Sequence, residues 1–302
     1  MPTAPASLFN WQMEYENPNT PEGINVDTEH PLKDFALLAI GVFGAIVLLI
    51  MVFSWSAEYL ARFVPFSFEQ ALIGKFETAL GADDKPAEDF EDVQRYLESL
   101  TARIVTAESL PEEMSVTVHF VDDETLNAFA TLGGHFVIFR GLLERMPSEN
   151  ALAMVIAHEV AHIKLRDPIV AFSRGVTVSA ALASMAGLAD SPLLGRLFDQ
   201  AGSLTTLKFS REQGATADEE TVKALLEIYG HVHGAETLFE VLDQASASDP
   251  PAFFSTHPAH SDRIAKIRAL TGRDDSAKLT ALPSFSAIGA SENPARLPVY
   301  QP

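Results

Sequence analysis

Cysteine is absent from this chain of 302 residues, which excludes disulfide bonds, a thiol nucleophile and any metal site built on thiolates. Basic residues are scarce, because 21 Lys and Arg stand against 41 Asp and Glu, for a formal net charge of −20. A chain this acidic is not expected to bind nucleic acid. Any metal ion must be held by His and carboxylate side chains.

Charged residues are also missing from one long apolar run, Phe35–Phe53. A helix over this run is long enough to cross a hydrocarbon core of about 30 Å. Trp55 and Tyr59 follow it, where aromatic side chains favour the membrane interface. We therefore predict a single transmembrane helix over residues 35–57, in contact with lipid, after a flexible acidic segment at residues 1–34.

Composition and periodicity divide the remainder of the chain into three parts. Residues 58–88 are predicted to hold a short amphipathic helix, over residues 66–80, and a linker. Residues 89–272 carry the periodic segments of a globular domain. Residues 273–302 are rich in Pro, Ser and Ala without a period, and we predict a disordered tail.

Six helices and two strands are expected within residues 89–272; two of the helices are short or late in the chain, one from Gly141 to Arg145 and one near residues 261–270. Apolar residues at three- and four-residue spacing predict helices over residues 89–107, 150–165, 210–229 and 235–245. Alternation predicts a strand over Ser115–Val121, and a second β-rich run covers residues 135–139. Ser148 is the expected N-cap of the helix over residues 150–165, and Asp167 with Pro168 is the expected stop signal.

The helix over residues 150–165 contains an H-E-x-x-H motif, formed by His158, Glu159 and His162. Residues four apart share one face of a helix, so the imidazoles of His158 and His162 can bind one metal ion, and this ligand type suits zinc. Glu159 lies about 100° around the helix, where it can accept a proton from water as a general base. Polar side chains in a buried helix need partners, which favours a metal site over a solvated helix face.

Four separated pieces of the sequence resemble the gluzincin membrane peptidases of the HtpX and CAAX prenyl protease type. They are the membrane helix, NAFATLGGHFVIFRGLL at 127–143, AHEVAHIKLRD at 157–167, and SREQGATAD at 210–218 followed by FFSTHPAHSDRI at 253–264. The resemblance implies a mainly α, zincin-like α+β fold with a small antiparallel sheet and one Zn²⁺ per chain. It also implies that an edge strand binds an extended polypeptide substrate; this strand consists of His135, Phe136, Val137, Ile138 and Phe139.

The sequence departs from this family at the third zinc ligand. The family has Glu four residues before the Asp of Ala-Asp, and here that position is Gly214. Asp218, by resemblance, orients a ligand imidazole, although it can also be considered as the ligand itself. His257 lies in a loop that is close to the metal in some relatives and is a further candidate. The choice between Asp218 and His257 stays open at this point.

Two functions from different classes follow. The first is a membrane-anchored zinc endopeptidase that hydrolyses unfolded or misfolded membrane or envelope proteins. The alternative is a weak or inactive peptidase homologue that serves as a peptide-binding or chaperone-like platform, because the third ligand is replaced. The expected location is a bacterial inner membrane, crossed once. The sequence leaves open the side on which the domain lies and the oligomeric state.

Overall fold

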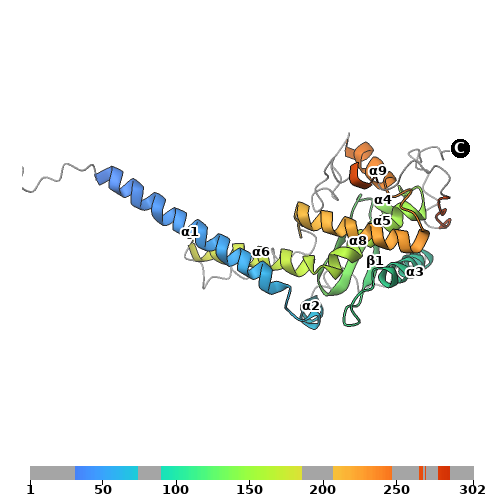
Figure 1. The fold of residues 1–302 in the computed structure, drawn as a ribbon, viewed down its shortest axis with the longest axis horizontal. Coiled ribbons are helices and arrows are strands. Elements are labelled where there is room, and N and C mark those ends of the chain that lie inside the picture. Colours follow the sequence, from blue (N-terminus) through green and yellow to red (C-terminus); the bar gives the residue numbers. More distant parts are fainter. Residues whose placement is uncertain are drawn as a thin grey trace, which may run out of the picture. The chain divides into compact units, whose positions relative to one another are not determined.

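The computed structural model describes residues 31–73, 90–185, 207–246, 265–267, 269 and 278–285. The chain divides into two units, Met1–Leu48 and Leu49–Pro302, which are described separately. In chain order the described elements are α1 (Pro31–Ala61), α2 (Phe66–Ile73), α3 (Glu91–Ala107), β1 (Thr117–Val121), β2 (Ala128–Ala130), the 3₁₀ turn η2 (Leu132–Gly134), β3 (His135–Phe139), α4 (Arg140–Leu143), α5 (Glu149–Lys164), α6 (Asp167–Met185), α8 (Arg211–Tyr229) and α9 (Thr237–Ser246) (Figure 1).

The first unit contributes the beginning of α1. Within the described parts of the chain, Leu32–Ala61 is the one helix long and apolar enough to cross a membrane. Its large apolar side chains are mostly exposed, as expected of a helix whose surroundings are lipid and not protein. The predicted helix over residues 35–57 therefore matches α1, which continues beyond the prediction at both ends.

The amphipathic helix that follows is observed as α2. Phe66, Glu69 and Ile73 form its buried face, whereas Phe68 is 52% exposed. The predicted helix extended to residue 80, but residues 74–89 lie outside the described part of the chain. In the sequence, Phe68 and Leu72 recur at four-residue spacing and indicate an apolar face that contains both. The observed buried face does not contain Phe68.

The small sheet is mixed, so the prediction of an antiparallel sheet was wrong. Its strand order is β1-β3-β2, with β1 parallel to β3 and β2 antiparallel to β3. The alternation of polar and apolar residues identifies which side chains face the core. It has the same period in parallel and antiparallel strands, so it does not indicate strand direction. β3 lies between two strands, so His135, Phe136, Val137, Ile138 and Phe139 do not form an edge strand. β1 and β2 are the outer strands.

A tight turn joins β2 to β3. Gly133 and Gly134 have φ angles of 70° and 84°, a region that glycine adopts without strain. A Cβ atom on Gly134 would lie 1.9 Å from the Ser115 carbonyl oxygen, so the chain can pass here only as glycine. The Gly-Gly pair thus places β3 beside both β1 and β2.

Helix α5 is the centre of the second unit, where it packs against α3, β2, α8 and α9 (Figure 1). Ser148 is its N-cap, as predicted, and accepts a hydrogen bond from the Ala151 N–H at 3.2 Å. Every residue from Glu149 to Ile163 is buried. The helix ends at Lys164, and Asp167, the predicted stop signal, begins α6.

The segment 278–285 is ordered against the start of α5, although it falls within the tail predicted to be disordered. The Glu149 N–H donates to the Thr280 carbonyl oxygen at 2.9 Å, and the Thr280 N–H donates to Asn150 Oδ1 at 2.8 Å. Phe285 is buried and its ring lies 5.5 Å from that of Tyr96. The prediction of disorder was therefore wrong for these eight residues.

Candidate active site

The H-E-x-x-H motif lies in the second half of α5, on a buried face of the helix. His158 and His162 are one turn apart, with 2% and 0% of their surfaces exposed. Their ring centroids are 4.6 Å apart and their planes cross at 85°. The two Nε2 atoms lie only 3.2 Å from each other. The helix therefore brings two imidazole nitrogens to one point, as the spacing predicted.

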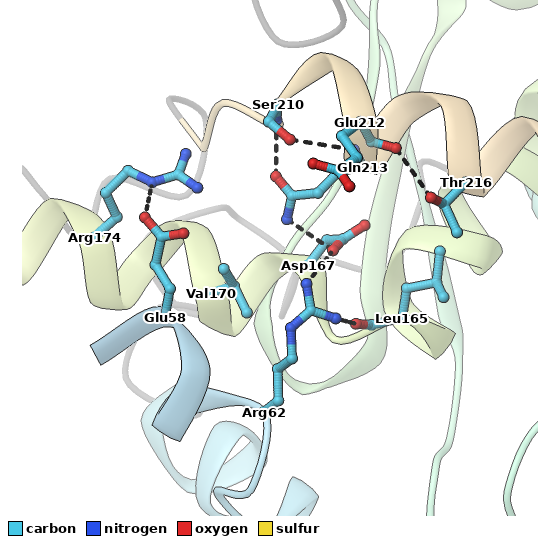
Figure 2. A pocket seen from close by; sticks show the side chains of 10 residues that line it. All are labelled: Glu58, Arg62, Leu165, Asp167, Val170, Arg174, Ser210, Glu212, Gln213 and Thr216. Carbon is cyan, nitrogen blue, oxygen red and sulfur yellow. Dashed lines mark hydrogen bonds and ion pairs between the residues drawn. The ribbon is translucent and has the colours of Figure 1, made fainter. Parts of the chain in front are cut away.

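His162 is oriented by a carboxylate whose role the sequence did not reveal. Asp167 Oδ2 lies 2.8 Å from His162 Nδ1, and Asp167 Oδ1 accepts a hydrogen bond from Gln213 Nε2 at 2.7 Å (Figure 2). Gln213 belongs to α8, where its side chain also completes a capping box with Ser210. A residue five positions after His162 shares no face with it on a continuous helix. The contact exists because α5 ends before Asp167.

His158 has a carboxylate of its own on α8. Asp218 Oδ1 lies 3.1 Å from His158 Nδ1. With both Nδ1 atoms facing carboxylates, the Nε2 atoms are the nitrogens turned toward each other. A carboxylate at Nδ1 fixes the ring orientation and raises the basicity of a ligand imidazole. Asp218 therefore contacts Nδ1 of His158, and its role in orienting that ring stays a prediction.

Gly214 lies on the same buried face of α8 as Asp218. The face consists of residues at three- and four-residue spacing, and its members are Gln213, Gly214, Ala217, Asp218 and Thr221. Since Gly214 is one turn before Asp218, a side chain at this position would be directed toward α5. Glu212 is exposed and lies off this face. The position that the family uses for its third ligand is therefore directed at the site, but it carries no side chain.

Phe209 forms a wall of the site. Its ring stacks on the His162 imidazole, with centroids 4.1 Å apart and planes at 24°. It precedes α8 and is 4% exposed. The sequence pattern did not reveal it, because a single Phe before a helix cap carries no distinguishing signal.

Glu159 is fully buried and contacts the outer edge of the sheet. Its Oε2 accepts a hydrogen bond from the Ala130 N–H at 2.7 Å. The Phe139 N–H donates to the Asn127 carbonyl oxygen and the Thr131 N–H to the His135 carbonyl oxygen, so these residues of β2 bond toward β3. Alternate residues bond in opposite directions. The N–H of Ala130 therefore points away from β3, toward the motif.

The residues present fit two positions of a zinc site. Zinc binds imidazole nitrogen at about 2.0–2.1 Å with tetrahedral angles, which requires two ligand nitrogens about 3.3 Å apart. The 3.2 Å between the Nε2 atoms of His158 and His162 meets this requirement. Across the described residues, no group of three His, Asp or Glu side chains is arranged to hold a metal ion. His257, the other candidate ligand, lies outside the described residues.

Asp167, which contacts His162, also lines a pocket of about 240 Å³ (Figure 2). The pocket is lined by residues from the end of α1, the start of α6 and the start of α8, among them Arg62, Arg174 and Gln213. Arg174 pairs with Glu58 at 2.5 Å. Asp167 lines this pocket whereas His158 and His162 do not, so the pocket is adjacent to the H-E-x-x-H motif but is not formed by its histidines.

Comparison with known proteins places these residues in context. The family model described as "Peptidase family M48" matches residues 91–271. The chain is 31% identical over 188 residues to "Mitochondrial metalloendopeptidase OMA1" of Schizosaccharomyces pombe, covering 61% of this chain and 55% of that protein. It is 29% identical over 188 residues to "Beta-barrel assembly-enhancing protease" of Escherichia coli K12, covering 58% and 38%.

A third relative is matched over most of its length. The chain is 26% identical over 256 residues to "Protease HtpX homolog" of Burkholderia mallei, covering 71% of this chain and 86% of that protein. By contrast, the chain spans about half the length of the OMA1 relative and less of the assembly-enhancing protease. The family model, by its matched residues 91–271, covers the domain that contains the motif.

Proposed function

The chain belongs to peptidase family M48, and we propose that it is a membrane-anchored zinc endopeptidase acting on unfolded or misfolded membrane or envelope proteins. The single observation that carries the proposal is the pair of Nε2 atoms 3.2 Å apart, from His158 and His162. Each of these imidazoles also has its own carboxylate at Nδ1. Two imidazole nitrogens at this separation match the spacing of two ligands on one tetrahedral zinc ion.

In this proposal His158 and His162 hold one Zn²⁺ per chain, with Asp218 and Asp167 orienting their rings. These two histidines would hold the ion, which when bound would supply Lewis-acid polarisation of the scissile carbonyl group and a more acidic water. Glu159 accepts the proton of the attacking water and passes it to the leaving amine. Its burial beside β2 keeps it within reach of a peptide bond that lies along that strand.

The substrate is proposed to bind as an added strand beside β2. This replaces the expectation that β3 is the edge strand, because β3 is paired on both sides. The outward N–H of Ala130 bonds to Glu159 and Ala130 is 1% exposed, so an extended peptide would have to displace Glu159 from this N–H, which would leave its backbone next to the general base. Recognition through backbone groups suits unfolded polypeptides, which offer the same N–H and C=O pattern whatever their sequence.

The membrane part of the proposal rests on α1. Residues 35–57 are proposed to cross the inner membrane of a bacterium once, as the resemblance to the HtpX type implies. Protease treatment of intact vesicles tests this proposal. A domain after residue 58 that is cleaved only when the vesicles are opened lies in the lumen, and a domain cleaved in intact vesicles lies outside. Release of the intact protein from the membrane by alkaline carbonate would contradict a transmembrane helix.

Gly214 favours a second candidate function, a peptide-binding platform with weak or no catalysis. The third protein ligand is replaced by a residue without a side chain, on the helix face directed at the site. The peptide-binding edge of β2 does not depend on zinc, so peptide binding would persist without hydrolysis. Both candidates use the same fold and differ in metal affinity and turnover.

Zinc content and casein cleavage by the full chain separate the two candidates. The endopeptidase predicts close to one zinc per chain and cleavage that is lost in Glu159→Gln. Peptide binding without zinc, even after reconstitution, would instead support the platform. The variant Gly214→Glu measures what the glycine does: a large gain in zinc affinity and activity identifies an impaired native site. No change would mean that another residue already fills the third position.

A further inference from the structure

Glu69, on the buried face of α2, holds together two turns that belong to the candidate active site. Its surface is 2% exposed, and a carboxylate so placed is unfavourable unless it is paired. Glu69 Oε1 accepts a hydrogen bond from Arg166 Nε at 2.8 Å, and it lies 2.6 Å from Arg166 Nη2 in the same ion pair. Glu69 Oε2 accepts a hydrogen bond from the Gly133 N–H at 3.1 Å. Each carboxylate oxygen thus contacts a different turn.

The first of these turns follows α5. Arg166 has a φ of 64°, which is uncommon for a residue with a side chain. Its guanidinium also donates to the Val64 carbonyl oxygen at 2.6 Å and lies 5.6 Å over the ring of Phe66. The side chain therefore enters the segment that links α1 to α2, and these contacts hold the backbone in its unfavourable conformation.

The neighbours of Arg166 connect the same segment to the metal-binding histidine. Arg62 Nη1 donates to the Leu165 carbonyl oxygen at 3.2 Å, and Arg62 Nη2 lies 3.9 Å from Asp167 Oδ1 (Figure 2). Asp167 Oδ2 in turn contacts His162 Nδ1. Residues 165–167 are therefore held between the segment after α1 and His162, so a shift of this turn moves the group that orients the imidazole.

The second turn follows β2. A Cβ atom on Gly133 would lie 2.9 Å from Ile73 Cγ2 and 3.2 Å from the Gln70 Cα, so this turn lies directly on α2. Three residues earlier, the Ala130 N–H bonds to Glu159. The carboxylate of Glu69 therefore bridges the turn that follows the metal-binding helix and the turn that follows the outer strand.

We propose that Glu69 is a positioning residue through which α2 sets the relative placement of His162 and the β2 edge. The inference rests on the proposed function, because it assigns these two groups to metal and peptide. Glu69 itself touches neither the two Nε2 atoms nor the outward edge of β2. Its effect is carried by Arg166 and Asp167 on one side and by Gly133 on the other. Displacement of α2, which directly follows the membrane helix, would therefore loosen both halves of the site together.

The test uses the full chain in lipid nanodiscs with the variant Glu69→Gln. Glutamine has the same size and retains an acceptor for the Gly133 N–H, but it cannot form the ion pair with Arg166. Amide hydrogen exchange of the metal-free protein is measured over residues 130–134 and 162–167, and zinc affinity is measured by competition with a chromophoric chelator. Leu100→Ala, a core change in α3 away from both turns, provides a variant of lowered stability as the control.

We expect exchange in both turns to accelerate at least about tenfold and zinc affinity to fall about tenfold, beyond any change in Leu100→Ala. Acceleration confined to α2, or equal in the control, would overturn the proposal. If Glu69→Gln does not fold, Arg166→Lys, which keeps the charge but loses the two-pronged contact, must give the same pattern in weaker form. A native chain that binds no zinc would contradict the proposed function, whereas the exchange measurement would still decide the role of Glu69.

Discussion

Two buried carboxyl groups lie against the two ends of α5, and their surroundings are opposite. Glu149, in the first turn, accepts hydrogen bonds from the Tyr96 hydroxyl at 2.7 Å, from Arg103 at 2.8 Å and from the Tyr229 hydroxyl at 2.8 Å. Burial by itself raises the pKa of Glu149, but these three donors outweigh it and lower the pKa below its usual value.

Glu108 lies at the other end, beside Lys164 in the last turn of α5. Its surface is 4% exposed, and neither carboxyl oxygen has a hydrogen-bond partner among the described residues. Lys164 donates instead to the Glu108 carbonyl oxygen and to Glu220. Burial raises the pKa of Glu108 to about 8; Lys164 opposes the rise and Glu220 adds to it. The carboxyl group is therefore neutral at pH 7.

The two ends of α5 therefore differ in stability. The start, at Glu149, stabilises the fold, whereas the end, beside Glu108, is less stable. The start of α5 is fixed by a satisfied charge and by the segment 278–285. The end of α5, next to His162, contains a neutral, unsatisfied carboxyl group and a residue with positive φ, Arg166. Natural proteins concentrate such local conflicts near functional sites. The helix places the two histidines on one face, whereas the carboxylates that contact their rings, Asp167 and Asp218, lie outside α5.

The largest effect is expected from Glu149→Ala. Removing the shared acceptor leaves two half-buried tyrosine hydroxyl groups and the partly exposed Arg103 without it. Hydrogen bonds to a charged group contribute about 1.5–3 kcal/mol each, so the free energy of unfolding should fall by about 3–5 kcal/mol. Chemical denaturation measures the loss, and Glu98→Gln, an exposed change on α3, is the matched control. Zinc affinity of the folded molecules should stay the same. If the free energy of unfolding fell by less than about 1 kcal/mol, the contacts of Glu149 at the start of α5 would not be a main source of stability.

Glu108→Gln, unlike Glu149→Ala, should raise the free energy of unfolding, by an amount that depends on pH. Between pH 4.5 and about 8 the unfolded chain has lost the proton of Glu108 whereas the folded chain keeps it, so the stability of the native protein falls as pH rises through this range. The variant has no titrating group at this position. Relative to the native protein, its free energy of unfolding should therefore rise by on the order of 3 kcal/mol between pH 5 and pH 8. Chemical denaturation of both proteins at pH 5 and pH 8 measures this difference. If the free energy of unfolding depends on pH in the same way in both proteins, the raised pKa of Glu108 is refuted.

Asp167→Asn tests the end of α5 next to His162, where the expected change in free energy is smaller. An amide can still fill the space beside His162 but carries no charge, so zinc affinity should fall about 10- to 100-fold, or about 1.4–2.8 kcal/mol. The stability of the metal-free protein should change less than in Glu149→Ala. If the two variants lower stability and zinc affinity in equal proportion, the ends of α5 do not have separate roles.

Local sequence signals predicted the helices that position the site. Ser148 was the expected N-cap of α5, and apolar spacing predicted the second helix from Ser210, so α5 and α8 begin within one residue of their predicted starts. The i, i+4 spacing of His158 and His162 likewise required a single helix and no tertiary information. These features depend on neighbours along the chain, which the sequence contains directly.

Features that depend on distant segments were missed or wrong. The strand direction in the sheet and the central place of β3 depend on how residues 122–134 return across the sheet, which alternation does not encode. Asp167 was interpreted as a helix stop, because its contact with His162 appears only once the chain turns at Arg166. Glu69 lies 97 residues from Arg166 in the sequence, and no periodic pattern connects them.

The most direct test of the shared metal is zinc X-ray absorption of the full chain loaded with one equivalent of Zn²⁺. We expect two imidazole nitrogens at about 2.0–2.1 Å and loss of one of them in His162→Ala. A spectrum without imidazole scattering, or one that His162→Ala leaves unchanged, would contradict a metal ion shared by the two histidines.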